Sequence, residues 1–261
     1  MNNIIVNFNQ ILDFSRQYNI PITKKRAILR EFIQVKILDL IYEEKEALKL
    51  SFTGGTSLRL LKNLDRFSED LDFDNLGLSN QRVGKLIQKV HQRLKKENIS
   101  VDLYENVKQN KQYYEFRFKD LLYSLRISNL KAEKLMIKFD YSDFWQGQKT
   151  HPSLLNRYGF VFNLITNGLN QVLVQKLQAY VFRQQTQPRD VYDIVWLKAQ
   201  GAQVDKQFIK INKLKTDLVQ LAKEKFIREK KKLSNFKQRL KPFLINEDRV
   251  KKLDLFLQVL K

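Results

Sequence analysis

The chain has 261 residues, a formal net charge of +20 and no cysteine. A chain of this length holds one large domain or two small ones. Hydrophobic residues make up 43% of the chain, enough for a packed core, which excludes a disordered protein. The lack of cysteine excludes disulfides, thiolate zinc sites and a cysteine nucleophile. Two histidines are too few for a multi-histidine metal centre.

The sequence has no stretch of the roughly 18 uninterrupted apolar residues that a membrane span needs. Its first ten residues also lack the basic segment and apolar run of a signal peptide. We therefore expect a cytoplasmic protein that makes no contact with a membrane.

Positive charge is concentrated at the C-terminal end. Residues 198–261 contain 18 basic and 7 acidic side chains, a net charge of +11. Phosphate backbones are the commonest partners of such a surface. The solvated surface of a lysine-rich protein would explain a single lysine run equally well, but the charge of the whole chain favours a nucleic acid.

Apolar spacing predicts the elements in chain order. The first fifty residues are predicted to be helical, and the helical spacing of apolar residues is clearest within residues 23–48. Further helices are predicted over residues 56–63 and from the N-cap Ser79 to about residue 97, and short strands over residues 50–53 and 69–74. The pattern then predicts strands over residues 99–104, 113–118, 123–127, 135–141 and 160–165. Helices follow over residues 169–184 and 190–199, the second ended by Gly201, with about three more to the end. We expect an α+β domain over residues 1–166 and a helical, strongly basic domain over residues 167–261.

A glycine turn predicts a phosphate site. Gly54 and Gly55 follow the first strand and precede a helix, so the backbone can approach a bulky anion closely. Free N–H groups at the start of that helix would point at the anion. Thr56 and Ser57 add hydroxyl donors.

Two carboxylates follow on the next strand. Asp70 and Asp72 project from the same face because side chains alternate along a strand. They repel each other and gain most by sharing a divalent cation. A third carboxylate is usually needed to bridge two metals, and Asp140 is the best candidate, with Lys138 on its face. A triphosphate held by the glycine turn and metals held by the carboxylates is the layout of nucleotidyl transfer.

The motifs GGTSL at residues 54–58 and RFSEDLDF at residues 66–73 resemble the AbiEii/AbiGii family of nucleotidyltransferase toxins, within the DNA polymerase β-like superfamily. The resemblance continues in QKLQA at residues 175–179, in Arg183 and in PRDVYDI at residues 188–194. It covers roughly residues 30–200, in the order of the family's motifs, and leaves the basic C-terminal helices outside.

The resemblance implies a polymerase β-like fold and an enzyme of EC 2.7.7 type that moves a nucleoside monophosphate from an NTP, with Mg²⁺ in a two-metal site. It implies an RNA acceptor, with the tRNA 3′ end as the expected target, and a cognate antitoxin. By position it implies metal ligation by Asp70 and Asp72, phosphate binding by Gly55, Thr56 and Ser57, a triphosphate contact by Lys176, and a further active-site role for Asp190. We expect Gly54 and Arg66 to bind the nucleotide as well.

Alternatives remain open at this point. The side chains of Lys176, Tyr180 and Arg183 share one face of a helix, and those of Asp190 and Asp193 share a face of the next helix. These basic and acidic faces form either a wall of the active site or an ion pair between the two helices. Arg66 either touches substrate or clamps a carboxylate. In a second hypothesis the enzyme transfers the nucleotide to a protein or a small molecule instead of RNA. In a third, this chain is a non-catalytic module that binds nucleic acid.

Overall fold

The computed structural model describes residues 3–108 and 111–261, which divide into two compact units. The first comprises Met1–Asn63, Phe67–Asp143 and Pro152–Thr166, and the second comprises Leu64–Arg66, Phe144–His151 and Asn167–Lys261. The chain passes into the second unit for the last time after Thr166. Two short segments that the sequence analysis assigned to the first region, Leu64–Arg66 and Phe144–His151, belong to the second unit.

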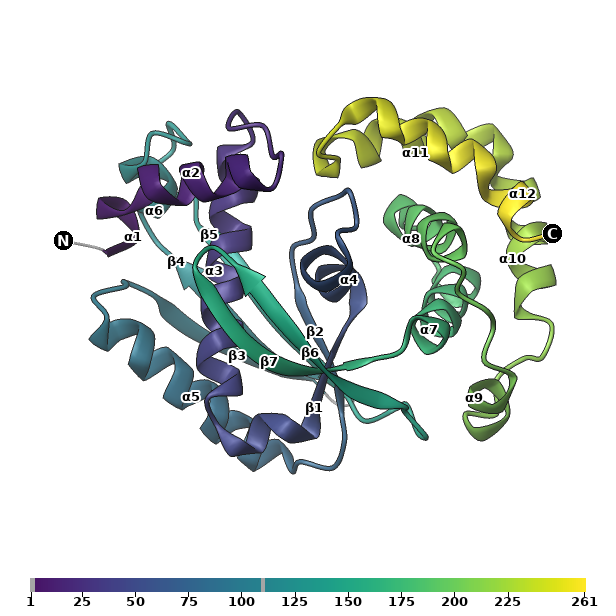
Figure 1. Ribbon diagram of the computed structural model, residues 1–261, viewed down its shortest axis with the longest axis horizontal. Coiled ribbons are helices and arrows are strands. Elements are labelled where there is room, and N and C mark those ends of the chain that lie inside the picture. Colours follow the sequence, from purple (N-terminus) through teal and green to yellow (C-terminus); the bar gives the residue numbers. More distant parts are fainter. Residues whose placement is uncertain (1–2, 109–110) are drawn as a thin grey trace. The chain divides into compact units, whose positions relative to one another are not determined.

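A mixed sheet carries the first unit (Figure 1). Among the described residues it has seven strands in the order β3-β4-β5-β2-β1-β7-β6. The strands are β1 (Leu50–Thr53), β2 (Leu71–Asn75), β3 (Asp102–Lys108), β4 (Lys111–Phe118), β5 (Leu135–Ser142), β6 (Thr150–Arg157) and β7 (Phe160–Asn167). β2 runs parallel to β5 and antiparallel to β1, while β1 runs parallel to β7. The carboxylate-bearing strand β2 therefore lies near the middle of the sheet.

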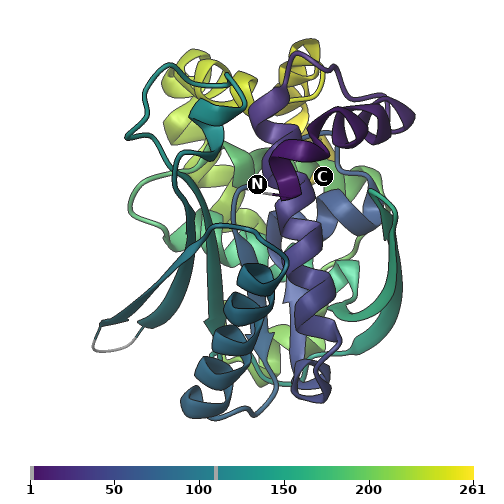
Figure 2. The same ribbon diagram turned by 90° about the vertical axis from the view of Figure 1, so that its left-hand side faces the viewer.

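One face of the sheet is an aromatic core. Phe73 of β2 stacks on Phe139 of β5 with ring centroids 4.8 Å apart, and Phe52 of β1 lies 5.4 Å from Phe73. Helices α3 (Lys25–Tyr42) and α5 (Asn80–Lys96) pack side by side over the sheet (Figure 1 and Figure 2). The unit also contains α1 (Asn3–Val6), α2 (Phe8–Gln17), α4 (Gly54–Lys62) and α6 (Leu121–Ser124). Because strand side chains alternate, the opposite face receives Asp72 and Asp140.

The predicted strand over residues 123–127 is wrong. This segment contains the end of the one-turn helix α6, and the amides of Ile127 and Ser128 both donate to the carbonyl of Leu122. Aromatic and β-branched residues in this segment favour a strand, but its backbone groups pair locally instead of with a neighbouring strand.

Strand β6 is not among the strands that the sequence pattern predicts. Its sequence, THPSLLNR, contains a proline and mostly polar or exposed residues, so it carries no clear alternation. β6 is the edge strand beside β7, where a proline is tolerated because one side of the strand needs no partner.

Helices make up the chain after β7. They are α7 (Leu169–Phe182), α8 (Pro188–Ala199), α9 (Lys206–Ile211), α10 (Leu218–Glu229), α11 (Leu233–Leu240) and α12 (Phe256–Val259), with short 3-10 turns at Lys230–Lys232, Lys241–Phe243 and Glu247–Leu255. The rings of Phe226 and Phe256 stack 4.6 Å apart, and Tyr180 lies 5.4 Å from Phe256, so α7, α10 and α12 share one core. The predicted α+β class with a helical C-terminal half is confirmed. Within the described part of the chain, no helix is long and apolar enough to cross a membrane.

Candidate active site

The glycine turn makes room for a carboxylate. Gly54 is the first residue of α4, directly after β1, and its φ of +73° is a conformation that other residues rarely adopt. A Cβ atom at this position would lie 2.3 Å from Oδ2 of Asp72. Any side chain at residue 54 would therefore displace the Asp72 carboxylate, so the turn and the carboxylate strand form one local arrangement.

A row of polar side chains crosses four strands at this level. The register pairs Thr53 of β1 with Asp72 of β2, Asp72 with Asp140 of β5, and Asp140 with Tyr113 of β4. Paired residues on neighbouring strands project from the same face, with the strands about 4.8 Å apart. Asp72 and Asp140 are thus direct neighbours, and Asp70 precedes β2 by one residue on the same alternation.

Lys138 is the cation of this cluster. Its Nζ lies 2.5 Å from Oδ2 of Asp140 and 4.3 Å from the centre of the Tyr113 ring. Burial by itself would lower the pKa of the Lys138 ammonium, but Asp140, with smaller effects from Asp70 and Asp72, raises it above its usual value. Lys138 lies on the face of β5 that residue alternation predicts, but the sequence pattern indicates no role for it.

The hydroxyls of the turn are engaged within the first unit. Thr56 Oγ1 donates to the backbone carbonyl of Asp70 at 2.5 Å, and the Ser57 and Thr166 hydroxyls lie 3.2 Å apart. Thr56 and Ser57 are both buried. The Thr56 bond ties the start of α4 to the residue before β2, which fixes Asp70 relative to the glycine turn.

The donor set fits a hard divalent cation. Among residues 3–108 and 111–261, no three histidine or acidic side chains are gathered into a site that could hold a metal ion alone. Mg²⁺ does not require one, because it is usually held by one or two carboxylates together with substrate phosphates and waters. Asp72 and Asp140, paired in register with Asp70 close by in sequence, supply carboxylates of that kind.

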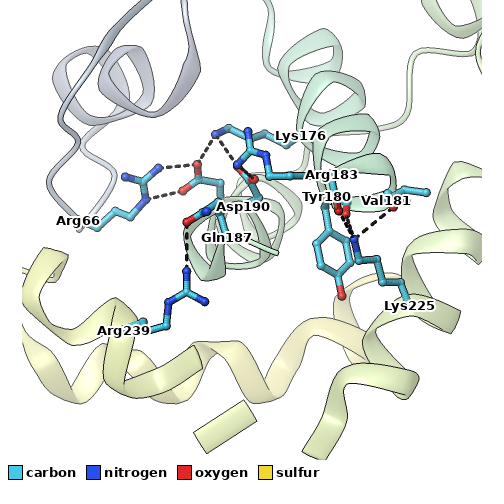
Figure 3. Close-up of polar contacts among 10 residues, drawn as sticks. Arg66, Lys176, Tyr180, Val181, Arg183, Gln187, Asp190, Lys225 and Arg239 are labelled. Carbon is cyan, nitrogen blue, oxygen red and sulfur yellow. Dashed lines mark hydrogen bonds and ion pairs between the residues drawn. The ribbon is translucent and has the colours of Figure 1, made fainter. Parts of the chain in front are cut away.

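The other predicted site residues belong to the second unit (Figure 3). Arg66 is 1% exposed, and its Nε and Nη2 donate to the two carboxylate oxygens of Asp193 at 2.6 Å each. The Arg66 guanidinium is therefore a carboxylate clamp, one of the two roles that the sequence left open. Its partner lies on α8 rather than on the strand of Asp70.

Lys176 of α7 joins both aspartates of α8. Its Nζ lies 2.8 Å from Oδ2 of Asp193 and 3.2 Å from Oδ1 of Asp190. Burial would lower the pKa of Lys176, but Asp193 and Asp190 raise it above its usual value. Burial would raise the pKa of Asp193, but Arg66 and Lys176 hold it below its usual value. Arg183 completes the network with a 2.7 Å ion pair to Asp190.

Lys225 of α10 fastens the end of α7 beside this network (Figure 3). Its Nζ donates to the carbonyls of Tyr180, Val181 and Arg183 at 2.7, 3.3 and 2.9 Å. The last carbonyls of any helix have no partner further along that helix, and a cation at a helix C-terminus is favourable. Lys225 is not among the residues predicted from the sequence, because one lysine in a lysine-rich helix carries no positional signal.

The chain matches the family described as nucleotidyl transferase AbiEii toxin of type IV toxin–antitoxin systems over residues 36–259. It therefore belongs to the AbiEii family of nucleotidyltransferase toxins. The match extends across the basic C-terminal helices, which the motifs alone did not cover.

Solved structures share the fold. The nucleotidyltransferase toxin MenT4 from Mycobacterium tuberculosis superposes with a TM-score of 0.53 at 16% identity, over 94% of this chain and 88% of that one. JHP933 from Helicobacter pylori superposes with a TM-score of 0.51 at 19% identity, over 90% of this chain and 91% of that one. No curated protein matches the chain in sequence. The likeness to the nucleotidyltransferase toxin confirms the predicted fold.

Proposed function

We propose that the protein is an Mg²⁺-dependent nucleotidyltransferase that moves a nucleoside monophosphate from an NTP to an RNA, with the tRNA 3′ end as acceptor, and that this activity is the toxin of a toxin–antitoxin pair. The observation that carries the proposal is the register of Asp72 with Asp140 beside the Gly54 turn. Membership of the AbiEii family supports the reaction class and a cognate antitoxin.

Residues of the first unit would carry the separate roles in the transfer reaction. Asp72 and Asp140, with Asp70 close by in sequence, would supply carboxylate ligands to a divalent cation that is also held by substrate phosphates and waters. The backbone at the start of α4 would face the triphosphate. An acceptor hydroxyl attacks the α-phosphorus and gives up its proton to solvent, the bond from the α-phosphorus to the β-phosphate oxygen breaks, and pyrophosphate leaves. Bound Mg²⁺ would supply positive charge for the attacking and leaving oxygens.

The C-terminal surface supports a polyanionic acceptor. The turn Lys230–Lys232 between α10 and α11 has no buried residue. The acidic residue that precedes it, Glu229, accepts hydrogen bonds from Thr186 at 2.7 Å and Tyr180 at 3.2 Å, so its carboxylate faces the α7–α8 turn. Three exposed lysines in sequence form a local positive surface that suits a phosphate backbone.

A transfer assay tests the proposal. The purified protein is mixed with Mg²⁺, each labelled NTP in turn and total tRNA, beside an Asp70→Ala variant that is checked for folding by circular dichroism. We expect label on RNA only with the intact carboxylate. Label on a protein would replace the RNA acceptor, and Asp70-independent transfer would contradict the site.

A binding assay separates catalysis from a non-catalytic role. Mg²⁺-dependent NTP binding that is lost in Asp70→Ala is expected of the enzyme. RNA binding without any such NTP binding would identify the protein as a nucleic-acid-binding module instead.

A further inference from the structure

We propose that the Lys138 ammonium occupies the carboxylate site in the absence of a divalent cation and competes with that cation for the same carboxylates. Binding of the divalent cation therefore releases Lys138 from Asp140. The inference rests on the proposed function, because it takes Asp72 and Asp140 as the carboxylates that hold the cation.

The contacts of Lys138 carry the inference. Its Nζ lies 2.5 Å from Oδ2 of Asp140, which is hydrogen-bonding distance for a charged pair. The side chains of Lys138 and Asp140 are 27% and 17% exposed, so both are only partly solvated and the pair is weakly screened. The Asp140 oxygen that faces Lys138 is therefore already neutralised by a cation of the chain itself.

The field at Lys138 extends beyond one partner. Asp70 and Asp72 also stabilise its charged form, and Asp72 is the direct neighbour of Asp140 in register. A divalent cation placed between Asp72 and Asp140 would repel an ammonium that stays at Asp140. The carboxylates therefore favour one cation or the other at this position.

The ammonium of Lys138 has a second favourable contact besides Asp140. Its Nζ lies over the Tyr113 ring, at 4.3 Å from the centroid, and the register pairs Lys138 with Glu115 of β4. Glu115 itself accepts from Arg117 at 2.6 Å. A flexible lysine stem can keep its contact with the aromatic ring while its ammonium leaves Asp140. Release of the lysine thus requires a rotation of its stem and no rearrangement of the sheet.

Mn²⁺ binding tests the competition without relying on activity. Mn²⁺ is titrated by electron paramagnetic resonance into the wild type and into Lys138→Met, Lys138→Arg, Lys134→Met and Asp72→Asn. Lys138→Met removes the competing charge and is expected to tighten Asp72-dependent Mn²⁺ binding about fivefold. Lys138→Arg keeps a competing cation and is expected to stay near the wild type. Lys134→Met removes a charge just before β5 and controls for the general loss of positive potential.

Lysine labelling measures the release directly. The protein is modified with an amine-reactive anhydride, with and without Ca²⁺ or Mn²⁺, and modification of Lys138 is quantified by mass spectrometry. We expect the cation to raise the modification of Lys138 several-fold in the wild type and not in Asp72→Asn. Asp72-dependent Mn²⁺ binding that is equal in wild type and Lys138→Met, with unchanged labelling, would overturn the inference and leave the proposed function in place. Absence of Asp72-dependent binding in both proteins would overturn the two together.

Discussion

Arg66 and Asp193 lie 127 residues apart in sequence and form a buried, two-bonded ion pair, with both N–O distances at 2.6 Å. Asp193 is fully buried and Arg66 is 1% exposed. The pair joins the segment Leu64–Arg66, which the chain places between α4 and β2, to helix α8 of the same unit. Burial makes each charge dependent on the other, because neither can be solvated alone.

Removal of one partner of this pair is expected to destabilise the protein strongly. Arg66→Met leaves the buried Asp193 carboxylate without its two-bonded partner and should lower the free energy of unfolding by about 3–5 kcal/mol. Urea denaturation measures the change. The exposed ion pair of Arg16 with Asp13 provides the control, and Arg16→Met should cost less than about 1 kcal/mol. Equal losses in the two variants would contradict the structural role of Arg66.

The same network predicts how stability depends on acid. The folded pKa of Asp193 lies below its usual value of 3.8, so its contribution is fully present above that value and is lost as the pH falls through the folded pKa. The difference in unfolding free energy between the wild type and Asp193→Asn should therefore be constant above about pH 5 and shrink below the usual value. Urea denaturation at a series of pH values tests this. A difference that grows as the pH falls would contradict the lowered pKa.

Gly54→Ala is expected to damage the site as well as the backbone. Gly54 and Gly201 have similar φ values, +73° and +81°, but a Cβ at Gly54 would meet Asp72 at 2.3 Å whereas a Cβ at Gly201 would meet nothing within 4 Å. Both alanine variants should lose about 1–2 kcal/mol of stability from the left-handed backbone. Only Gly54→Ala should also lose transfer, by about 10²-fold, because Asp72 is displaced. Thermal melts and the transfer assay measure the two effects, and equal transfer by the two variants would contradict the contact.

The lysine turn is expected to set the salt dependence of RNA binding. Replacing Lys230, Lys231 and Lys232 by glutamine should weaken tRNA binding and reduce the slope of log affinity against log salt by about 2, at about 0.7–0.9 per phosphate contact. The control replaces three other exposed lysines, Lys206, Lys210 and Lys215, in the same way. An equal change in both triple variants would show that total charge, rather than this turn, binds the RNA.

Local patterns predicted the part of the site that is local in sequence. The strand β1, the glycine turn and β2 follow one another within 26 residues, from Leu50 to Asn75, and their apolar runs and glycines specify them directly. Alternation likewise put Asp140 and Lys138 on one face of β5. The pairing of Asp72 with Asp140 depends on β2 lying parallel to β5, which no local pattern encodes.

The remaining features could not be predicted from the sequence, because they depend on partners far away along the chain. The sequence left Arg66 with two roles because its partner Asp193 lies on a helix far along the chain, and only the fold brings them together. Strand β6 escaped detection because its place at the sheet edge relaxes the alternation that marks a strand. The segment at residues 123–127 has strand-forming residues but closes local hydrogen bonds on Leu122. In each case tertiary context outweighed local preference.

The rate of labelled-nucleotide transfer to tRNA by Asp72→Asn, measured beside Asp102→Asn, tests the central claim most directly. Asp102 is an exposed aspartate of the edge strand β3 and pairs with Lys119, so its variant makes the same chemical change away from the site. We expect transfer to fall by about 10³-fold or more in Asp72→Asn and to stay near the wild-type rate in Asp102→Asn. Transfer at the wild-type rate by a folded Asp72→Asn variant would contradict the assignment of the active site to the carboxylates beside the Gly54 turn.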